Sequence, residues 1–364
     1  MDKKDVYIYY SPATDITGKK LQEALGVEGG TNKPKGKKLV IGWGAKTKED
    51  ISFPKTTKVL NHPNAIKTNR NKFEAVRIMA NNLNKEGRTI IPEYITSDRI
   101  KVALDANEIS FPLVGRTKYH QGGKGFWSCP TVAQLDAALE AGAHHFQKMI
   151  PVKDEYRLHV FKDEVIHAVK KVKRNDQEFE EAWIEDELAR QKSLAEKNNN
   201  PFDDEMARNI LRRQAKNATA GGANMVLRSN RMGWKFSIVK KFSKDLEQSA
   251  IDAVKALGLD FGAVDCCLDT NGNPYIFEVN SGPGLEATSF DKYVESFTEL
   301  ISGKKTNKKA TDFYKDDKDE KPTASEKDFM KMQLSRLQGM IDDANDDELD
   351  TIKKVGSTLI FGGQ

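Results

Sequence analysis

The chain has 364 residues, of which 38% are hydrophobic and 31% charged, and its formal net charge is +4. This length can hold two or three domains with a sizeable core, and so small a net charge argues against a nucleic-acid-binding protein. The three cysteines, Cys129, Cys266 and Cys267, exclude a disulfide framework and a Cys-x-x-Cys zinc site. No apolar signal region and no run of about 18 apolar residues occur, so we expect a cytoplasmic protein without membrane contact.

The first 62 residues have the pattern of a small α/β domain. Residues 6–10 and 38–43 are apolar strand candidates, and residues 17–25 between them have a helical pattern that ends at Gly26. Strand, helix and strand in about 40 residues favour an α/β unit. Trp43 stands between two glycines at the end of the second strand. It either lines a substrate cleft or packs at the edge of the core.

The next part of the chain holds a helix and a glycine-rich turn. Residues 69–83 predict a helix with one apolar side, made of Phe73, Val76, Met79, Ala80 and Leu83. Residues 111–114 are a strand candidate, and a glycine-rich turn follows it. Backbone N–H groups of such a turn can bind phosphate oxygens, while Arg116 and Lys124 supply positive charge. A plain surface hairpin is the alternative.

A helix and two strands come next. Residues 131–141 predict a helix with Thr131 as its N-cap, and residues 156–161 and 165–172 predict two strands. By alternation, one face of the first strand carries Arg157, His159 and Phe161, and one face of the second carries Val165, His167, Val169 and Lys171.

Residues 175–222 and the last 62 residues differ in composition from the rest. The first segment is charged and helical, with a break at residues 198–201, and predicts a helical insertion that is either a lid or a surface hairpin of helices. Residues 303–324 predict a charged linker. Residues 325–364 predict a helical tail with an apolar stripe of Met330, Leu334, Leu337 and Ile341. We expect this tail to dock on the body, on another subunit or on a partner protein.

An acidic hairpin precedes that linker. Residues 264–268 and 275–279 are strand candidates joined through Asn271-Gly272, a strong hairpin signal. Pairing them can bring Asp265 together with Glu278 and Asn280, which project from the same face. Carboxylate and amide oxygens suit Mg²⁺, which keeps open positions for nucleotide phosphates. An ordinary acidic turn is the alternative. The glycines of residues 281–284 would let the backbone approach a ligand.

The order of these motifs resembles that of the ATP-grasp carboxylate–amine ligases over residues 60–300. The segment Glu-Val-Asn-Ser-Gly-Pro-Gly after the hairpin is similar to the metal-binding end of that family. The resemblance implies an ATP-grasp fold of the α/β (α+β) class, with a small N-terminal domain over residues 1–62 and a nucleotide-binding and catalytic region over residues 63–302. The chain looks most like the glutamate-adding peptide ligases, and also like a group of ligases encoded by phages, for which the location would be the host cytoplasm.

The resemblance also implies roles for individual residues. Arg116 takes the place of a phosphate-binding lysine, which is a departure from the family pattern. The residues expected to bind ATP are Lys72, Arg116, Gly122, Gly123, Lys124, Gly125, Gln147, Lys148, Met149, Ile150 and Glu155. Those expected to bind Mg²⁺ are Asp265, Glu278 and Asn280, with two ions and with Mn²⁺ as a substitute. The catalytic residues implied are Arg157, Lys171, Arg228 and Asn230.

The implied activity is ATP-dependent, ADP-forming amide-bond formation through an acyl phosphate. The carboxylate would come from an amino acid or from the C-terminus of a peptide or protein, and the second substrate would be an amine. Two alternatives stay open, namely a kinase that phosphorylates a hydroxyl and a non-catalytic nucleotide-binding assembly protein. His120, His159 and His167 are either substrate-binding residues or structural histidines.

Overall fold

The computed structural model describes residues 1–84, 89–118, 125–222 and 224–303. Gly122, Gly123, Lys124 and His120 lie outside the described residues, as do the predicted linker beyond residue 303 and the whole predicted tail. Within the described ranges, no helix is both long and apolar enough to cross a membrane.

The N-terminal sheet is parallel and has the strand order β2-β1-β3-β4. Its strands are β1 (Val6–Tyr10), β2 (Glu28–Gly30), β3 (Leu39–Trp43) and β4 (Lys58–Leu60), and helix α1 (Ile16–Leu25) follows β1. Every residue of β3 is buried, as continuous apolar runs in parallel sheets predict. Gly26 ends α1 in the left-handed conformation that glycine favours (φ +63°). The predicted elements of this segment are confirmed.

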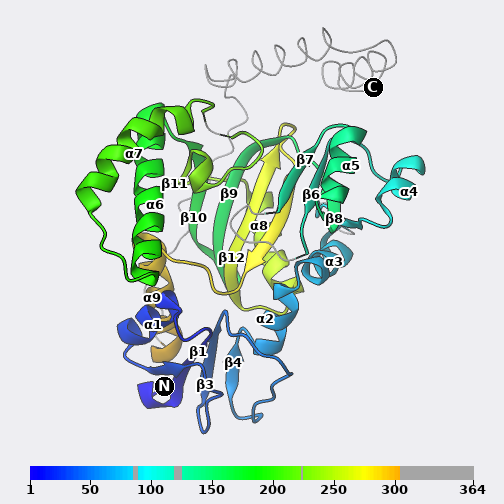
Figure 1. Cartoon of the computed structure of the whole chain (residues 1–364). Helices are drawn as coiled ribbons and strands as arrows, with labels where there is room; N and C mark the ends of the chain where they lie inside the picture. The colour runs from blue at the N-terminus through cyan, green and yellow to red at the C-terminus, as the bar shows by residue number, and fades with distance from the viewer. Residues whose placement is uncertain (85–88, 119–124, 223, 304–364) are drawn as a thin grey trace, which may run out of the picture. The chain divides into compact units, whose positions relative to one another are not determined.

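The central sheet is antiparallel and has the order β11-β10-β9-β12-β13 (Figure 1). Its strands are β9 (Val152–Phe161), β10 (Glu164–Lys173), β11 (Trp234–Ile238), β12 (Phe261–Asp269) and β13 (Pro274–Asn280). One face packs on α8 (Lys244–Ala256) and α3 (Lys72–Leu83) through a buried cluster that includes Leu158 and Val264. The other face carries Arg157 and Asp265, and it ends at an aromatic cluster on α9 (Ala287–Ser302).

A third, smaller sheet has the order β5-β8-β6-β7, and its neighbouring strands are antiparallel. Its strands are β5 (Ile95–Thr96), β6 (Leu113–Arg116), β7 (Phe126–Cys129) and β8 (His145–Lys148). Helices α4 (Ile100–Asp105) and α5 (Val132–Glu140) pack on it around Leu113 and Phe146. Thr131 is the N-cap residue of α5, but its side chain makes no capping hydrogen bond.

Two helices, α6 (Asp176–Lys197) and α7 (Asp204–Thr219), form the insertion. They pack on each other through a small buried cluster of Ile184, Leu188, Leu211 and Ala215. Asn175 and Glu178 form a capping box at the start of α6, and Asp203 caps α7 as its sequence predicts. Figure 1 shows the pair beside β10 and β11.

Three predictions of local structure are wrong. The helix predicted over residues 69–83 is two helices, α2 (Pro63–Arg70) and α3, because Asn71 has an extended backbone and caps α3 with its side chain. Phe73 is 37% exposed and lies outside the core of α3. Val165 faces away from His167, because the register of β10 against β9 shifts between these two residues.

Trp43 joins the N-terminal sheet to the central one. It is fully buried, stacks on Phe261 (ring centroids 5.6 Å apart) and meets Tyr293 edge-on (5.2 Å), so it does not line a cleft. Next to it, Gly44 donates a hydrogen bond from its N–H to the carbonyl of Ser281 (3.2 Å). A Cβ on Gly282 would come within 2.7 Å of Gly44 Cα. The glycines of this turn therefore allow two backbone segments to approach each other.

Candidate functional site

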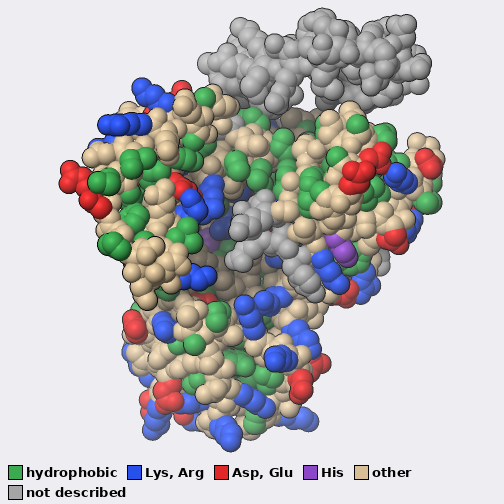
Figure 2. Space-filling model, in the orientation of Figure 1, with side chains coloured by type: hydrophobic (Ala, Val, Ile, Leu, Met, Phe, Trp, Pro, Cys, Tyr) green, Lys and Arg blue, Asp and Glu red, His purple; other side chains and the backbone are tan. Residues whose placement is uncertain are grey.

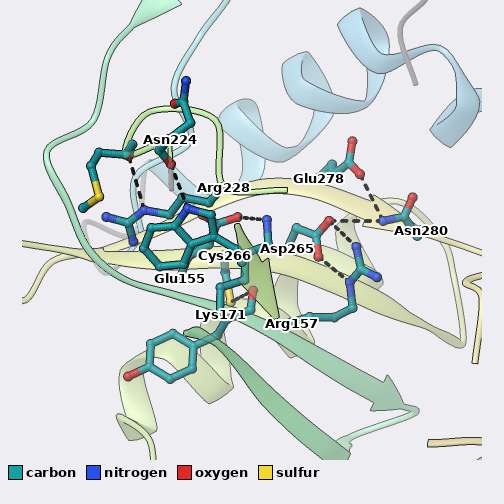
Figure 3. A network of polar contacts seen from close by, with 12 residues as sticks. Glu155, Arg157, Lys171, Asn224, Arg228, Asp265, Cys266, Glu278 and Asn280 are labelled. Carbon is teal, nitrogen blue, oxygen red and sulfur yellow. Dashed lines mark hydrogen bonds and ion pairs between the residues drawn. The ribbon is translucent and has the colours of Figure 1, made fainter. Parts of the chain in front are cut away.

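The hairpin of β12 and β13 brings three oxygen-bearing side chains together. Asp265 pairs directly with Glu278 in the register of the two strands, and Asn280 lies two residues further on the same face. The Asn280 Nδ2 donates to Glu278 Oε1 at 3.1 Å and lies 3.5 Å from Asp265 Oδ2 (Figure 3). Two carboxylates and one amide form a donor set that fits Mg²⁺, which takes its remaining ligands from water and phosphate. Among the described residues, no group of three or more His, Cys, Asp or Glu side chains could hold a metal by itself.

Arg157 on β9 lies next to Asp265 because β9 and β12 are neighbours in the sheet. Its Nε donates to Oδ1 of Asp265 at 2.6 Å and its Nη2 donates to Oδ2 at 2.9 Å. Burial raises the pKa of Asp265, but the Arg157 guanidinium outweighs this effect, so that pKa lies below its ordinary value. The carboxylate is therefore ionised at neutral pH, as a metal ligand must be.

Two further cations reach the hairpin from other elements. Lys72, the first residue of α3, places its Nζ 3.2 Å from Glu278 Oε2. Arg116 ends β6 and stacks over the ring of Phe126, 4.7 Å from its centroid. Burial lowers the pKa of Arg116, and interactions with Tyr94, Glu278 and Glu155 oppose this effect. Figure 2 shows Lys and Arg side chains on the walls of a hollow in this face of the molecule.

A second ion pair lies further along β9. Lys171 on β10 donates to Glu155 on β9, and both side chains are mostly buried. Burial raises the pKa of Glu155, and the Lys171 ammonium opposes that rise. Arg228 donates from its Nη2 to the carbonyl of Val152 at 2.8 Å and stacks on Trp234, 4.7 Å from the ring centroid.

The remaining predicted residues lie at the edges of this group. Asn230 is in a short turn and accepts a hydrogen bond from Arg174 Nη2 at 2.8 Å. Gln147 and Lys148 belong to β8 and pair with β6. The N–H of Met149 donates to the carbonyl of Pro112 (2.9 Å), and the carbonyl of Ile150 accepts from Val152 (2.9 Å). Gly125 has a positive φ of 62° and lies against the side chain of Thr117.

Two aromatic residues of the site carry no recognisable sequence motif. Phe236 lies under both Arg157 and Lys171, at 5.0 and 5.9 Å from its ring centroid. Tyr94 packs on His145 with ring centroids 4.3 Å apart, and burial raises its pKa to about 12. Alternation along residues 234–238 could have placed Phe236 on this face of the sheet, but no comparable signal exists for Tyr94.

His159 and His167 lie next to each other on the same face, with ring centroids 5.5 Å apart. His159 is buried, and its Nδ1 has no hydrogen-bond partner among the described residues. Burial lowers the pKa of His159 to about 3, so this side chain is neutral at pH 7. Burial also lowers the pKa of the half-buried His167.

Comparison with known proteins gives a sequence match and a structural match. Residues 212–302 match the RimK-like ATP-grasp domain. The chain is 48% identical over 46 residues to a probable alpha-L-glutamate ligase of Shewanella loihica, a match that covers 13% of this chain and only 15% of that protein.

Among solved structures, D-alanine–D-alanine ligase from Bacillus anthracis is similar, with 14% identity, a TM-score of 0.50, and coverage of 82% of this chain and 94% of that one. The ATP-grasp ligase PsnB, complexed with a minimal precursor, Mg and ADP, has 13% identity, a TM-score of 0.49, and coverage of 82% and 99%. The domain match and the D-alanine–D-alanine ligase structure confirm the predicted ATP-grasp fold.

Proposed function

We propose that this protein is an ATP-dependent, Mg²⁺-dependent carboxylate–amine ligase that forms an amide bond and releases ADP and phosphate. The observation that carries the proposal is the pairing of Asp265 with Glu278, with Asn280 beside them and with Arg157 and Lys72 bound to the two carboxylates. The domain match over residues 212–302 includes this hairpin.

The side chains divide into three proposed groups. Asp265, Glu278 and Asn280 hold the metal, with two Mg²⁺ ions in the full complex and with Mn²⁺ able to replace them. Bound Mg²⁺ supplies positive charge to the phosphate oxygens. Charge along the phosphates comes from Lys72, Arg116, Arg157 and Arg228. The nucleoside lies against Glu155, which binds the ribose, and against the backbone of residues 147–150, which meets adenine.

The chemistry needs no side-chain nucleophile. A substrate carboxylate oxygen attacks the γ-phosphorus of ATP, and the bond to ADP breaks, which gives an acyl phosphate. The amine nitrogen then attacks the acyl carbon, loses a proton, and phosphate leaves. Arg157, Arg228 and Asn230 stabilise the charge that develops on the transferred group and on the acyl oxygen. Lys171 pairs with Glu155 and opposes the rise in its pKa that burial causes.

The substrates in this proposal are an amine and a carboxylate from an amino acid or from the C-terminus of a peptide or protein. The PsnB structure contains a minimal precursor, and the Shewanella loihica protein is described as a glutamate ligase. We assign residues 1–62 to an N-terminal domain, 63–302 to the catalytic region, 303–324 to a linker and 325–364 to a tail. We place the protein in the cytoplasm.

The proposal is tested by trapping the acyl phosphate. The purified protein is incubated with ATP, Mg²⁺, candidate carboxylates and hydroxylamine, and hydroxamate is measured together with ADP. A ligase gives equal amounts of the two, whereas a kinase gives ADP with a stable phosphoester and no hydroxamate. The Glu278→Gln variant should form both products about 10²–10³-fold more slowly, and Glu74→Gln, which changes a partly exposed carboxylate paired with Arg77, should behave as wild type.

The substrates themselves can be found by incubation of the protein with ATP, Mg²⁺ and a cell extract. A new compound whose mass equals that of an amine and a carboxylic acid minus one water identifies both. The same extract with Glu278→Gln protein is the control. Nucleotide binding without ADP formation from any carboxylate or amine would instead favour a non-catalytic assembly protein.

A further inference from the structure

Three polar contacts join the segment of α6 to the loop that carries Arg228 and Asn230. Arg174, just before α6, donates to Asn230 Oδ1 at 2.8 Å. Asp186 on α6 accepts from Arg231 Nε at 2.7 Å. Glu178 in the first turn of α6 accepts from Lys235 at the end of the loop.

The other side of the same loop is attached to the nucleotide end of the central sheet. Arg228 donates to the carbonyl of Val152 at the start of β9 and stacks on Trp234. The indole N–H of Trp234 closes the loop by donating to the carbonyl of Asn224 at 2.7 Å. The loop therefore lies between β9, which carries the candidate site, and α6, which does not.

We propose that α6 is a support that holds the loop of residues 224–235 in its site-facing position, with Asp186 and Glu178 as positioning residues for Arg228 and Asn230. The expected effect of Asp186 and Glu178 on turnover rests on the proposed function, whereas their expected effect on the position of the loop does not. Each of these exposed ion pairs is weak alone, but all of them hold the same short loop. The insertion is thus part of the site's architecture, although no hydrogen bond or ion pair described for residues 175–222 reaches Asp265, Glu278 or Asn280 directly.

The neighbour of Asp186 provides a matched control. Glu185 on the same helix pairs with Arg208 on α7, so this ion pair stays within the insertion and does not reach the loop. Lys192 and Asp204 pair in the same way at 3.2 Å. Loss of charge at residue 185 therefore tests the stability of the helix pair, and loss of charge at residue 186 tests the support of the loop.

Hydrogen–deuterium exchange of the amides of residues 224–235 is the first test. The double variant Glu178→Gln/Asp186→Asn should exchange about 3–10-fold faster there than wild type, while Glu185→Gln should exchange at the wild-type rate. Equal rates in the double variant and wild type would overturn the inference, whatever the protein catalyses. Circular dichroism and the melting temperature check that both variants are folded.

A charge exchange is the second test. Asp186→Arg and Arg231→Asp should each raise KM for ATP several-fold, and the combined variant should recover most of the loss because the pair forms again with reversed signs. Failure to recover, with both single variants folded, counts against the inference. If the exchange rates change as expected but wild-type protein forms no hydroxamate with any carboxylate, the proposed function fails and the support of the loop by α6 stands.

Discussion

Arg157 binds both carboxylate oxygens of Asp265, through Nε at 2.6 Å and Nη2 at 2.9 Å. Glu278, directly opposite Asp265 on the next strand, pairs instead with Lys72 from α3 at 3.2 Å. The two carboxylates of one candidate cation site thus have different partners. Removal of the charge of Asp265 and removal of the charge of Glu278 should therefore have different effects on the stability of the fold.

The substitution Asp265→Asn should destabilise the fold. The side chain of Asp265 is 14% exposed, and without its charge the guanidinium of Arg157 is left mostly buried and unpaired. Loss of one partner of such a pair costs about 3–5 kcal/mol. The free energy of unfolding, measured in urea, should fall by that order. The double variant Asp265→Asn/Arg157→Met should recover part of it, and an unchanged unfolding midpoint in Asp265→Asn would contradict the expectation.

The substitution Glu278→Gln should leave the fold intact and remove activity. The Lys72–Glu278 pair is about a quarter to a third exposed, so its loss should cost less than about 1 kcal/mol. ATP turnover should drop about 10²–10³-fold, as for the loss of one electrostatic contact to a transition state. If this variant hydrolyses ATP at the wild-type rate, Glu278 is not a ligand of the proposed metal site.

Two glycines of one turn should respond differently to alanine. A Cβ on Gly282 would lie 2.7 Å from the Cα and N atoms of Gly44, whereas a Cβ on Gly284 would meet no atom within 4 Å. Gly282→Ala should therefore cost about 1–3 kcal/mol of stability, because the backbone of either segment must move. Gly284→Ala should be close to neutral. Thermal melting of the two variants compares them, and equal melting temperatures would show that the contact with Gly44 is unimportant.

His159 should make stability depend on pH. Its pKa in the folded protein is about 3 because of burial, with the charges of His167 and Arg157 acting in the same direction. In the unfolded chain the His159 ring has its ordinary pKa of 6.5, so below that pH the unfolded state binds a proton that the folded state does not. The stability that the neutral ring contributes is therefore present above pH 6.5 and is lost as the pH falls toward 3. The greatest slope is about 1.4 kcal/mol per pH unit.

Urea unfolding of wild type and His159→Phe between pH 6.5 and 4.5 measures this slope. Phenylalanine fits the contacts with Tyr293 and His167 and does not titrate. The variant should lose less stability per pH unit than wild type. Parallel curves for the two proteins would show that His159 is not the group responsible.

The metal hairpin could be predicted from the sequence because its signals are local. The Asn271-Gly272 turn marks the hairpin and pairs Cys266 with Ile276, and a bulge between Asp265 and Cys266 then shifts the register so that Asp265 lies opposite Glu278. The contact of Arg157 with Asp265 has no such local signal, because it depends on the order of strands in the sheet. The break at Asn71 has no clear sequence signal, because an asparagine inside an apolar helical pattern looks like one more polar position, although its side chain caps a new helix.

The orientation of Val165 and the contacts of Trp43 also have no local signal in the sequence. Val165 faces the opposite side because one extra residue in β10 reverses the alternation, and no residue type announces such a bulge. Trp43 packs in the core, as one of its two sequence interpretations predicts, but its partners Phe261 and Tyr293 come from a distant part of the chain and could not be identified from the local pattern. The sequence patterns therefore describe single elements well, and they do not describe contacts that form only when the elements assemble.

The adjacency of β9 and β12 also affects how the molecule can be made. Arg157 and Asp265 are 108 residues apart in the chain, and the whole α6–α7 pair lies between them. While the protein is being synthesised, β9 therefore has an unpaired edge on one side until β12 emerges. The helix pair can fold from local contacts during this interval, whereas the sheet must close a long loop. A nascent chain that stops before residue 261 consequently exposes a strand edge that can pair with other chains.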